Sequence, residues 1–150
     1  RPRGMAGTCV NVEGKTRIGN RAYGYSRDGS AWAKTDQNRT SATQGDGGVY
    51  SSLEDLATWS KFLRSKNLFP EKILTNEQPA PIFYGYGMFE ALRHSKTIQF
   101  HRGSSIGFRT GFMRVPADNI TIIFLSNRDE GNGDEICYQV LQANYDIIAL

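Results

Sequence analysis

The sequence is poor in the residues that would indicate a metal centre, a disulfide framework or a membrane span. It has 2 cysteines, 2 histidines and 5 prolines in 150 residues, and no stretch approaches the roughly 18 consecutive apolar residues of a membrane-spanning helix. Cys9 and Cys137 lie near opposite ends of the chain and show neither metal-ligand spacing nor a C-x-x-C motif. We expect two free, packed thiols, although a disulfide is neither asserted nor excluded, and we expect no metal and no cofactor.

The charge is also small. There are 18 basic and 15 acidic residues, giving a net charge of +3, and the lysines and arginines are scattered along the chain rather than striped. This pattern disfavours nucleic-acid binding, which concentrates positive charge on one face. The chain begins RPRG, without an initiator methionine or an apolar signal region, so we expect its natural start to lie elsewhere. The sequence gives no indication of localisation.

What is present is typical of one globular domain or of part of a larger one. Hydrophobic residues make up 39% of the chain, and there are 16 glycines besides. Residues 1–78 form a loop-rich region with one helix. Within it, residues 1–47 show no sustained apolar period, only short extended candidates at 9–12 and 21–25. So long a loop is uncommon inside a compact domain, which indicates either a functional loop layer or a segment that packs on something outside this chain.

The helix of this first region is predicted at residues 52–65. Ser51 and Glu54 have the spacing of a capping box, in which the serine oxygen and the carboxylate satisfy free N–H groups at the helix start. Apolar residues then recur at helical spacing, namely Leu53, Leu56, Ala57, Phe62 and Leu63.

Residues 79–150 predict an antiparallel sheet closed by a C-terminal helix. The predicted strands are 83–92, 96–100, 107–115 and 120–125, with a type I turn at 116–119. The last strand, ITIIFL, is almost continuously apolar, which is typical of a strand covered on both faces. An apolar stripe from Ile136 to Ile148 predicts the helix, with Asp134 and Glu135 in its first turn. The fold class is therefore α+β, a meander with a helix packed on it, and part of its cover lies outside the chain.

One short segment has the composition of a catalytic strand edge. His101-Arg102-Gly103-Ser104 is predicted at the end of the second strand. The glycine allows a substrate to approach the backbone, and the Ser104 N–H can point at a developing oxyanion. The alternative is a turn with an incidental histidine. A nucleophile is not evident, because no serine has a lysine three residues later and there is no G-x-S-x-G, H-E-x-x-H or EF-hand motif.

Several stretches, in a fixed order, match the motifs of one known family. They are residues 2–5 (PRGM), 45–59 (GDGGVYSSLEDLATW), 84–88 (YGYGM), 101–108 (HRGSSIGF) and 124–127 (FLSN). They resemble the motifs P-L-G-M, G-G-(L/V)-x-S-(T/S)-x-x-D-L-x-x-W, Y-G-(Y/L)-G-(W/M), (K/H)-x-G followed by G-(F/Y), and V-x-L-(S/T/A)-N. These belong to the β-lactamase-like serine hydrolases, which include class C β-lactamases, D-alanyl-D-alanine carboxypeptidases and esterases.

The resemblance implies a partial β-lactamase/transpeptidase-like fold. Family members carry a nucleophilic serine with a lysine three residues later, and a Tyr-x-Asn motif, both upstream of the P-L-G-M turn; neither occurs here. We therefore expect the C-terminal part of such a hydrolase, with only the third of its three active-site elements. In the family the terminal helices pack on one face of the sheet and a helical subdomain covers the other.

The resemblance also assigns the site residues. His101 takes the place of the family's Lys or His, which polarises the site and contacts the carboxylate or leaving group of the substrate. Gly103 gives close approach and the Ser104 N–H is one of two oxyanion donors. Asn127 matches a substrate-contacting residue at the rim. Asp46 and Gly47 fall where many class C β-lactamases have an aromatic residue, and with His at 101 this favours the esterase and peptidase-like branch.

The resemblance thus predicts a parent chemistry of acyl transfer through a serine ester, on β-lactams, D-amino-acid peptides or carboxylic esters. Alone, the chain is expected to be inactive. Two alternatives stay open: a non-catalytic binding or structural module on the same scaffold, and one subunit of a split hydrolase completed by a separate chain. The second predicts exposed edge strands and apolar patches, and hence self-association.

Overall fold

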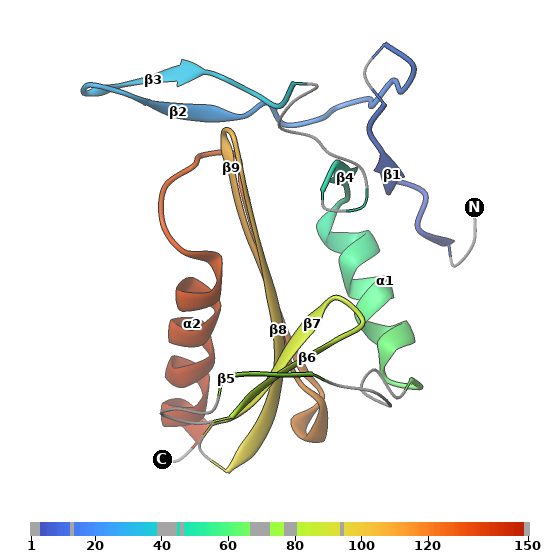
Figure 1. Ribbon diagram of the computed structural model, residues 1–150, viewed down its shortest axis with the longest axis vertical. Helices are drawn as coiled ribbons and strands as arrows, with labels where there is room; N and C mark the ends of the chain where they lie inside the picture. Colours follow the sequence, from blue (N-terminus) through green and yellow to red (C-terminus); the bar gives the residue numbers. More distant parts are fainter. Residues whose placement is uncertain are drawn as a thin grey trace.

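The structure is a computed structural model that describes residues 4–12, 14–38, 45, 47–66, 73–76, 81–93 and 95–148. Its centre is a six-stranded antiparallel sheet in the order β10-β9-β8-β7-β6-β5. The strands are β5 (Ile73–Asn76), β6 (Ile82–Gly85), β7 (Met88–Arg93), β8 (Lys96–Ser105), β9 (Phe108–Val115) and β10 (Ile120–Ser126). Helices α1 (Leu53–Leu63) and α2 (Gly133–Ile148) lie on opposite sides of the long β8–β9 hairpin (Figure 1).

The sheet is a meander in which each strand pairs with the next one along the chain, which confirms the predicted α+β class. The predicted strand 83–92 is instead a hairpin of β6 and β7. Tyr86 and Gly87 turn the chain there, with φ angles of 49° and 76°. Two successive positive φ angles are the geometry of a tight hairpin turn whose twist matches that of the flanking strands. The predicted turn at 116–119 is a single turn of 3-10 helix, Pro116–Asp118, followed by Asn119 in the left-handed conformation.

The predicted C-terminal helix is present and packs on one face of the sheet. The buried core between α2 and the sheet consists of Ala91, Ile98, Met113, Val115, Cys137 and Leu141. The start of α2 lies very close to β9: a Cβ added to Gly111 would lie only 2.4 Å from the Gly133 carbonyl oxygen. This pair of glycines sets the height of the first turn of α2 above the sheet.

Strand β10 has a helix on each side, as its apolar sequence predicts, but the cover is incomplete. Ile120, Ile122 and Phe124 pack against the core under α2. On the other side the Thr121 and Ser60 hydroxyls lie 2.6 Å apart, which joins β10 to α1. Most of the strand is half-buried, and the Leu125 side chain is exposed.

Helix α1 is confirmed with a different cap from the one expected. Its N-cap is Ser52, whose hydroxyl accepts a hydrogen bond from the Asp55 N–H at 3.2 Å. Ser51 faces the N-terminal segment instead, with its hydroxyl 2.8 Å from that of Thr8. Thr8 also donates to Asp55, so the helix start is tied to the segment before β1 (Cys9–Val10). The helix ends at Leu63, two residues before the predicted end.

The loop-rich first region contains two small antiparallel pairs that the sequence did not indicate clearly. β1 pairs with β4 (Val49–Tyr50), and β2 (Tyr25–Asp28) forms a hairpin with β3 (Ala31–Lys34). Figure 1 shows this hairpin across the tip of β8 and β9. β5 was also not predicted. Both cysteines are free thiols, and burial raises the pKa of Cys137 to about 11.

Candidate active site at the open end of strand β8

Strand β8 pairs with β7 along its first half and with β9 along its second half, and the two pairings overlap at Gln99 and Phe100. Its pairing with β7 runs from Arg93 with Lys96 to Phe89 with Phe100. Its pairing with β9 runs from Gln99 with Arg114 to Ser105 with Phe108. Within the described part of the chain, residues 101–105 therefore have a neighbouring strand on one side only. The predicted site residues lie inside this strand and not after its end, because its pairing with β9 extends to Ser105.

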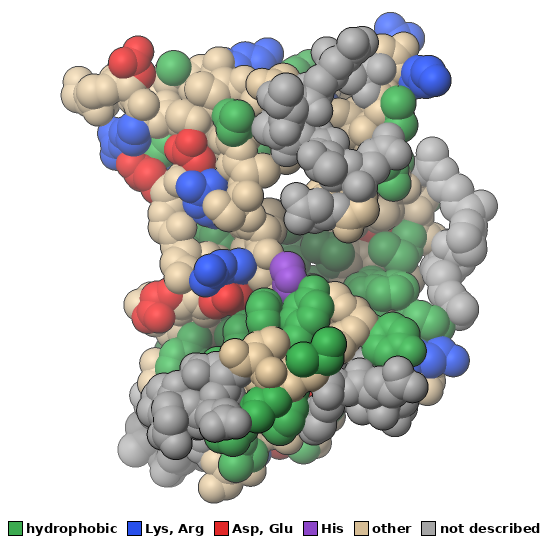
Figure 2. Space-filling view, viewed as in Figure 1, with side chains coloured by type: hydrophobic (Ala, Val, Ile, Leu, Met, Phe, Trp, Pro, Cys, Tyr) green, Lys and Arg blue, Asp and Glu red, His purple; other side chains and the backbone are tan. Residues whose placement is uncertain are grey.

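The His101 ring is held beside aromatic side chains at the start of this open segment. It stacks on Phe89 with ring centroids 5.6 Å apart and an interplanar angle of 16°, and the Tyr84 ring lies 6.1 Å away. Its Nδ1 lies 2.8 Å from the Arg102 carbonyl oxygen. Figure 2 shows a hollow on this face of the molecule, bordered by a group of hydrophobic side chains.

Gly103 and Ser104 follow in the same strand. A Cβ at Gly103 would lie 2.3 Å from the Thr110 hydroxyl on β9. Because glycine has no side chain, this face of the strand carries no side-chain atoms at residue 103. Ser104 pairs with Arg109 and is exposed. In an antiparallel strand the N–H and C=O groups of alternate residues point to opposite sides, so an open strand edge presents hydrogen-bonding groups for a ligand.

A carboxylate from α2 stands against this segment. Asp134 lies in the first turn of α2, and its Oδ2 is 3.6 Å from the Arg102 guanidinium. Its other oxygen is buried and has no hydrogen-bond partner among the described residues. Burial raises the pKa of Asp134, while the charges of Arg102 and His101 oppose that rise. The close approach of Gly111 and Gly133 is what brings this helix end to β8.

The tip of the β8–β9 hairpin is held by the N-terminal region. The Tyr25 N–H donates to the carbonyl oxygens of Gly107 and Asn127, at 3.3 and 3.0 Å. Gly24 and Gly107 touch so closely that a Cβ on Gly107 would lie 2.6 Å from Gly24. The side-chain amide of Gln37 also contacts this tip, where it donates a hydrogen bond to the Ser105 hydroxyl at 2.6 Å.

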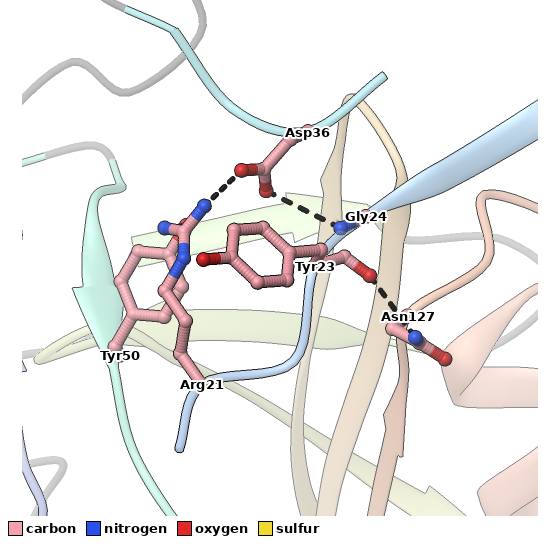
Figure 3. Close-up of polar contacts among 6 residues, drawn as sticks. All are labelled: Arg21, Tyr23, Gly24, Asp36, Tyr50 and Asn127. Atoms are coloured by element: carbon pink, nitrogen blue, oxygen red, sulfur yellow. Dashed lines mark hydrogen bonds and ion pairs between the residues drawn. The ribbon is translucent and has the colours of Figure 1, made fainter. Parts of the chain in front are cut away.

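A charged and aromatic cluster supports this region (Figure 3). Arg21 forms an ion pair with Asp36, and Asp36 also accepts a hydrogen bond from the Gly24 N–H at 3.2 Å. Arg21 donates to the Tyr50 hydroxyl at 2.9 Å, and its guanidinium lies over the Tyr23 ring at 4.6 Å. Burial raises the pKa of Tyr50. The cluster joins residues 21–36 to β4 and so fixes the segment that carries Gln37.

Comparison with known proteins identifies the family of the chain. The family model for Beta-lactamase matches residues 1–143. The chain belongs to the beta-lactamase family. A D-aminopeptidase of Gluconobacter oxydans (strain 621H) is 24% identical over 92 residues, covering 55% of this chain and 17% of that relative. The chain therefore spans about a sixth of the length of this curated relative. No solved structure matches the chain.

The resemblance to the beta-lactamase family, predicted from the sequence, is thus confirmed. The site residues that this resemblance predicted do not all lie together in the structure. His101, Gly103 and Ser104 lie together on β8. Asn127 is exposed and uses its side-chain amide to donate to the Tyr23 carbonyl oxygen at 3.0 Å (Figure 3). Asp46 lies outside the described residues. Gly47 is exposed just before β4, and no hydrogen bond among the described residues joins it to β8.

Other residues of this region were missed by sequence reasoning. Asp134 was noted only as a helix-start acid, and the motif comparison had no place for Gln37 or the Arg21–Asp36 pair. An N-terminal region so rich in polar residues was the one available signal. The described helices include none that is long and apolar enough to cross a membrane.

Proposed function

We propose that this chain forms the third-motif part of a serine-dependent acyl-transfer site, on the open end of β8. The observation that carries the proposal is that residues 101–105 pair with β9 alone among the described residues, and so leave one strand edge for a substrate. An extended substrate can add to such an edge through main-chain hydrogen bonds. Gly103 allows it to approach, and the Ser104 N–H is one donor to the carbonyl oxygen that becomes negative during acyl transfer.

The chain lacks a recognisable nucleophile, so on its own it is proposed to bind such substrates without turning them over. An oxyanion donor lowers the barrier of a reaction that a nucleophile begins, and it does not replace the nucleophile. We therefore propose that the chain is the C-terminal part of a hydrolase whose Ser-x-x-Lys and Tyr-x-Asn elements belong to another part of the parent enzyme.

Among β-lactams, esters and D-amino-acid peptides, we favour the peptides as substrates of the parent site. The support is the relative whose name is D-aminopeptidase, together with histidine at position 101. The esterase reading shares the same chemistry and differs only in the leaving group.

The test is an intact-mass spectrum of the purified chain before and after incubation with a fluorophosphonate and a chromogenic β-lactam. Hydrolysis of a p-nitrophenyl ester and of a D-alanine p-nitroanilide is followed in parallel. We expect no adduct and no turnover, together with amide NMR shifts at residues 101–105 when N-acetyl-D-alanine is added. A covalent adduct would contradict the absence of a nucleophile, and unchanged amide shifts would reject the substrate-binding role.

A second candidate is one subunit of a split hydrolase, because large apolar side chains are exposed on α1 and on β5 to β7. The exposed fractions are 51% for Leu53, 72% for Ile73 and 60% for Leu92. Where such side chains form a patch, that patch is a contact surface for another chain. Analytical ultracentrifugation distinguishes the readings: the subunit reading predicts association of the isolated chain, and a monomer at high concentration would favour a self-standing binding module.

A further inference from the structure

The polar contacts of His101 define which of its two ring nitrogens is available to a ligand. Nδ1 lies 2.8 Å from the Arg102 carbonyl oxygen. A carbonyl oxygen only accepts hydrogen bonds, so a hydrogen bond at this distance requires the proton to be on Nδ1. In the neutral ring Nε2 then carries a lone pair and accepts. Within the described residues, nothing is hydrogen-bonded to Nε2.

The ring is also fixed in orientation. Stacking on Phe89 at 5.6 Å and 16° restricts rotation of the imidazole, and the Tyr84 ring closes the same side at 6.1 Å. A free imidazole exchanges its two tautomers readily, whereas a ring with one nitrogen bonded to the backbone keeps one of them. The aromatic contacts and the backbone contact thus act together on the same tautomer.

We propose that His101 is held as the Nδ1–H tautomer with Nε2 turned to the open edge of β8, and that this edge binds a carboxylate only after Nε2 has taken up a proton. The inference rests on the proposed function for the ligand, and it adds the condition under which the ligand binds. A lysine at this position would be a permanent cation near neutral pH. A neutral histidine instead offers an acceptor, and becomes a cation when one proton moves from solvent to Nε2.

Among the described residues, the charged neighbours of His101 are Arg102, next in the strand, and Asp134, from α2. Tyr84 from β6 adds a phenol, while β7 and β9 contribute Phe89 and Phe112. The Asp134 and Arg102 charges oppose each other in an ion pair at 3.6 Å. Protonation of His101 is therefore the change that most alters the charge of the edge.

The first measurement is the tautomer, because it does not require activity or a ligand. The chain has two histidines, and a His94→Gln variant leaves a single imidazole signal to assign. Long-range 1H–15N correlation at about pH 8 is expected to show a protonated Nδ1 and an unprotonated Nε2. A protonated Nε2 at that pH overturns the inference and leaves the proposed function intact.

The second measurement is the affinity for N-acetylglycine, a minimal acyl carboxylate, followed by the amide shifts of residues 101–105. We expect binding about tenfold tighter at about pH 5.5 than at about pH 8, because a charge-assisted hydrogen bond replaces contact with a neutral ring. His101→Lys is expected to bind equally at both pH values, and His101→Gln to bind weakly at both. Amide spectra of each variant establish that it is folded.

The outcomes separate the two proposals. Equal affinity of the wild-type chain at both pH values, with His101→Lys also binding, overturns the inference while the strand-edge site stands. Absence of binding in the wild-type chain and in His101→Lys at both pH values overturns the proposed function and this inference with it.

Discussion

The two halves of strand β8 differ more than any two neighbouring segments of the molecule. Residues 96–100 pair with β7, and Gln99 and Phe100 pair with β9 as well; this half buries Ile98 and Gln99, which are 4% and 9% exposed. Residues 101–105 pair, among the described residues, with β9 alone, and Arg102 and Ser104 are exposed. The first half contributes apolar area to the core under α2. The second half has hydrogen-bonding groups and chemistry-bearing side chains with little core to stabilise.

Under the proposed function, one strand serves both stability and substrate binding. A strand with partners on both sides has its backbone groups satisfied, so it offers nothing to a ligand. A strand that outruns one neighbour keeps its geometry from the covered half while its far half stays available. The rigid half thus holds the site residues in place, which is the arrangement that a binding site on a regular element provides.

The largest loss of stability is expected from Ile98→Ala in the covered half of β8. Ile98 is part of the core with Val115 and Cys137, and deleting its outer carbons leaves a cavity. We expect a loss of about 2–5 kcal/mol in the free energy of unfolding, measured by urea denaturation. The matched control is Ser104→Ala in the open half, with an expected loss below about 0.5 kcal/mol. Equal losses would show that the two halves of the strand are equally structural.

The second test compares two glycines on neighbouring strands. At Gly111 a Cβ would lie 2.4 Å from the Gly133 carbonyl oxygen and 2.7 Å from the Cys137 sulfur, so alanine must push α2 away from β9. At Gly103 the nearest atom is the hydroxyl of Thr110, which can rotate away. We expect Gly111→Ala to cost about 1–3 kcal/mol and Gly103→Ala clearly less. A smaller melting-temperature shift for Gly111→Ala than for Gly103→Ala would contradict this view of the helix contact.

The elements that form the core around the covered half of β8 are also the ones that the sequence predicted well. Apolar periodicity identified α1, the last three strands and α2, because a residue that faces a core must be apolar wherever the core is. Ser52 took the cap expected at Ser51, because Ser51 is engaged with Thr8 in a contact between distant segments. The β6–β7 turn was missed because Tyr86, an aromatic residue in the left-handed conformation, gives little turn signal in sequence.

The open half and its supports were predicted less completely. Motif resemblance located His101, Gly103 and Ser104, because those residues are neighbours in sequence. It had no means of finding Asp134, Gln37 or the Arg21–Asp36 pair, which reach the region from α2 and from residues 21–37. Their positions depend on long-range contacts such as that of Gly24 with Gly107, and polar loop sequence carries no periodicity from which to infer them.

A smaller effect is expected from Asp134→Asn, and it depends on pH. Burial raises the pKa of Asp134, so the folded chain binds this proton more tightly than the unfolded chain does. The carboxyl then favours folding most below its ordinary pKa and loses that advantage as pH rises through the raised value. From about pH 3 to about pH 7 the stability of the asparagine variant relative to wild type should therefore rise. Urea denaturation at both pH values measures it, and an opposite trend would show that the Arg102 pair dominates.

The smallest effect is expected from Asn127→Ala, which loosens the support of the open end without touching β8. The Asn127 amide donates to the Tyr23 carbonyl oxygen at 3.0 Å in an exposed setting. Its loss should cost about 0.5–1 kcal/mol locally. Because the Tyr25 N–H bonds to the Asn127 and Gly107 carbonyl oxygens, its hydrogen exchange should accelerate several-fold, while amides of the covered half of β8 keep their rates. Faster exchange at Ile98 as well would mean that the two halves open together, and the open end would then not be a separate, locally supported site.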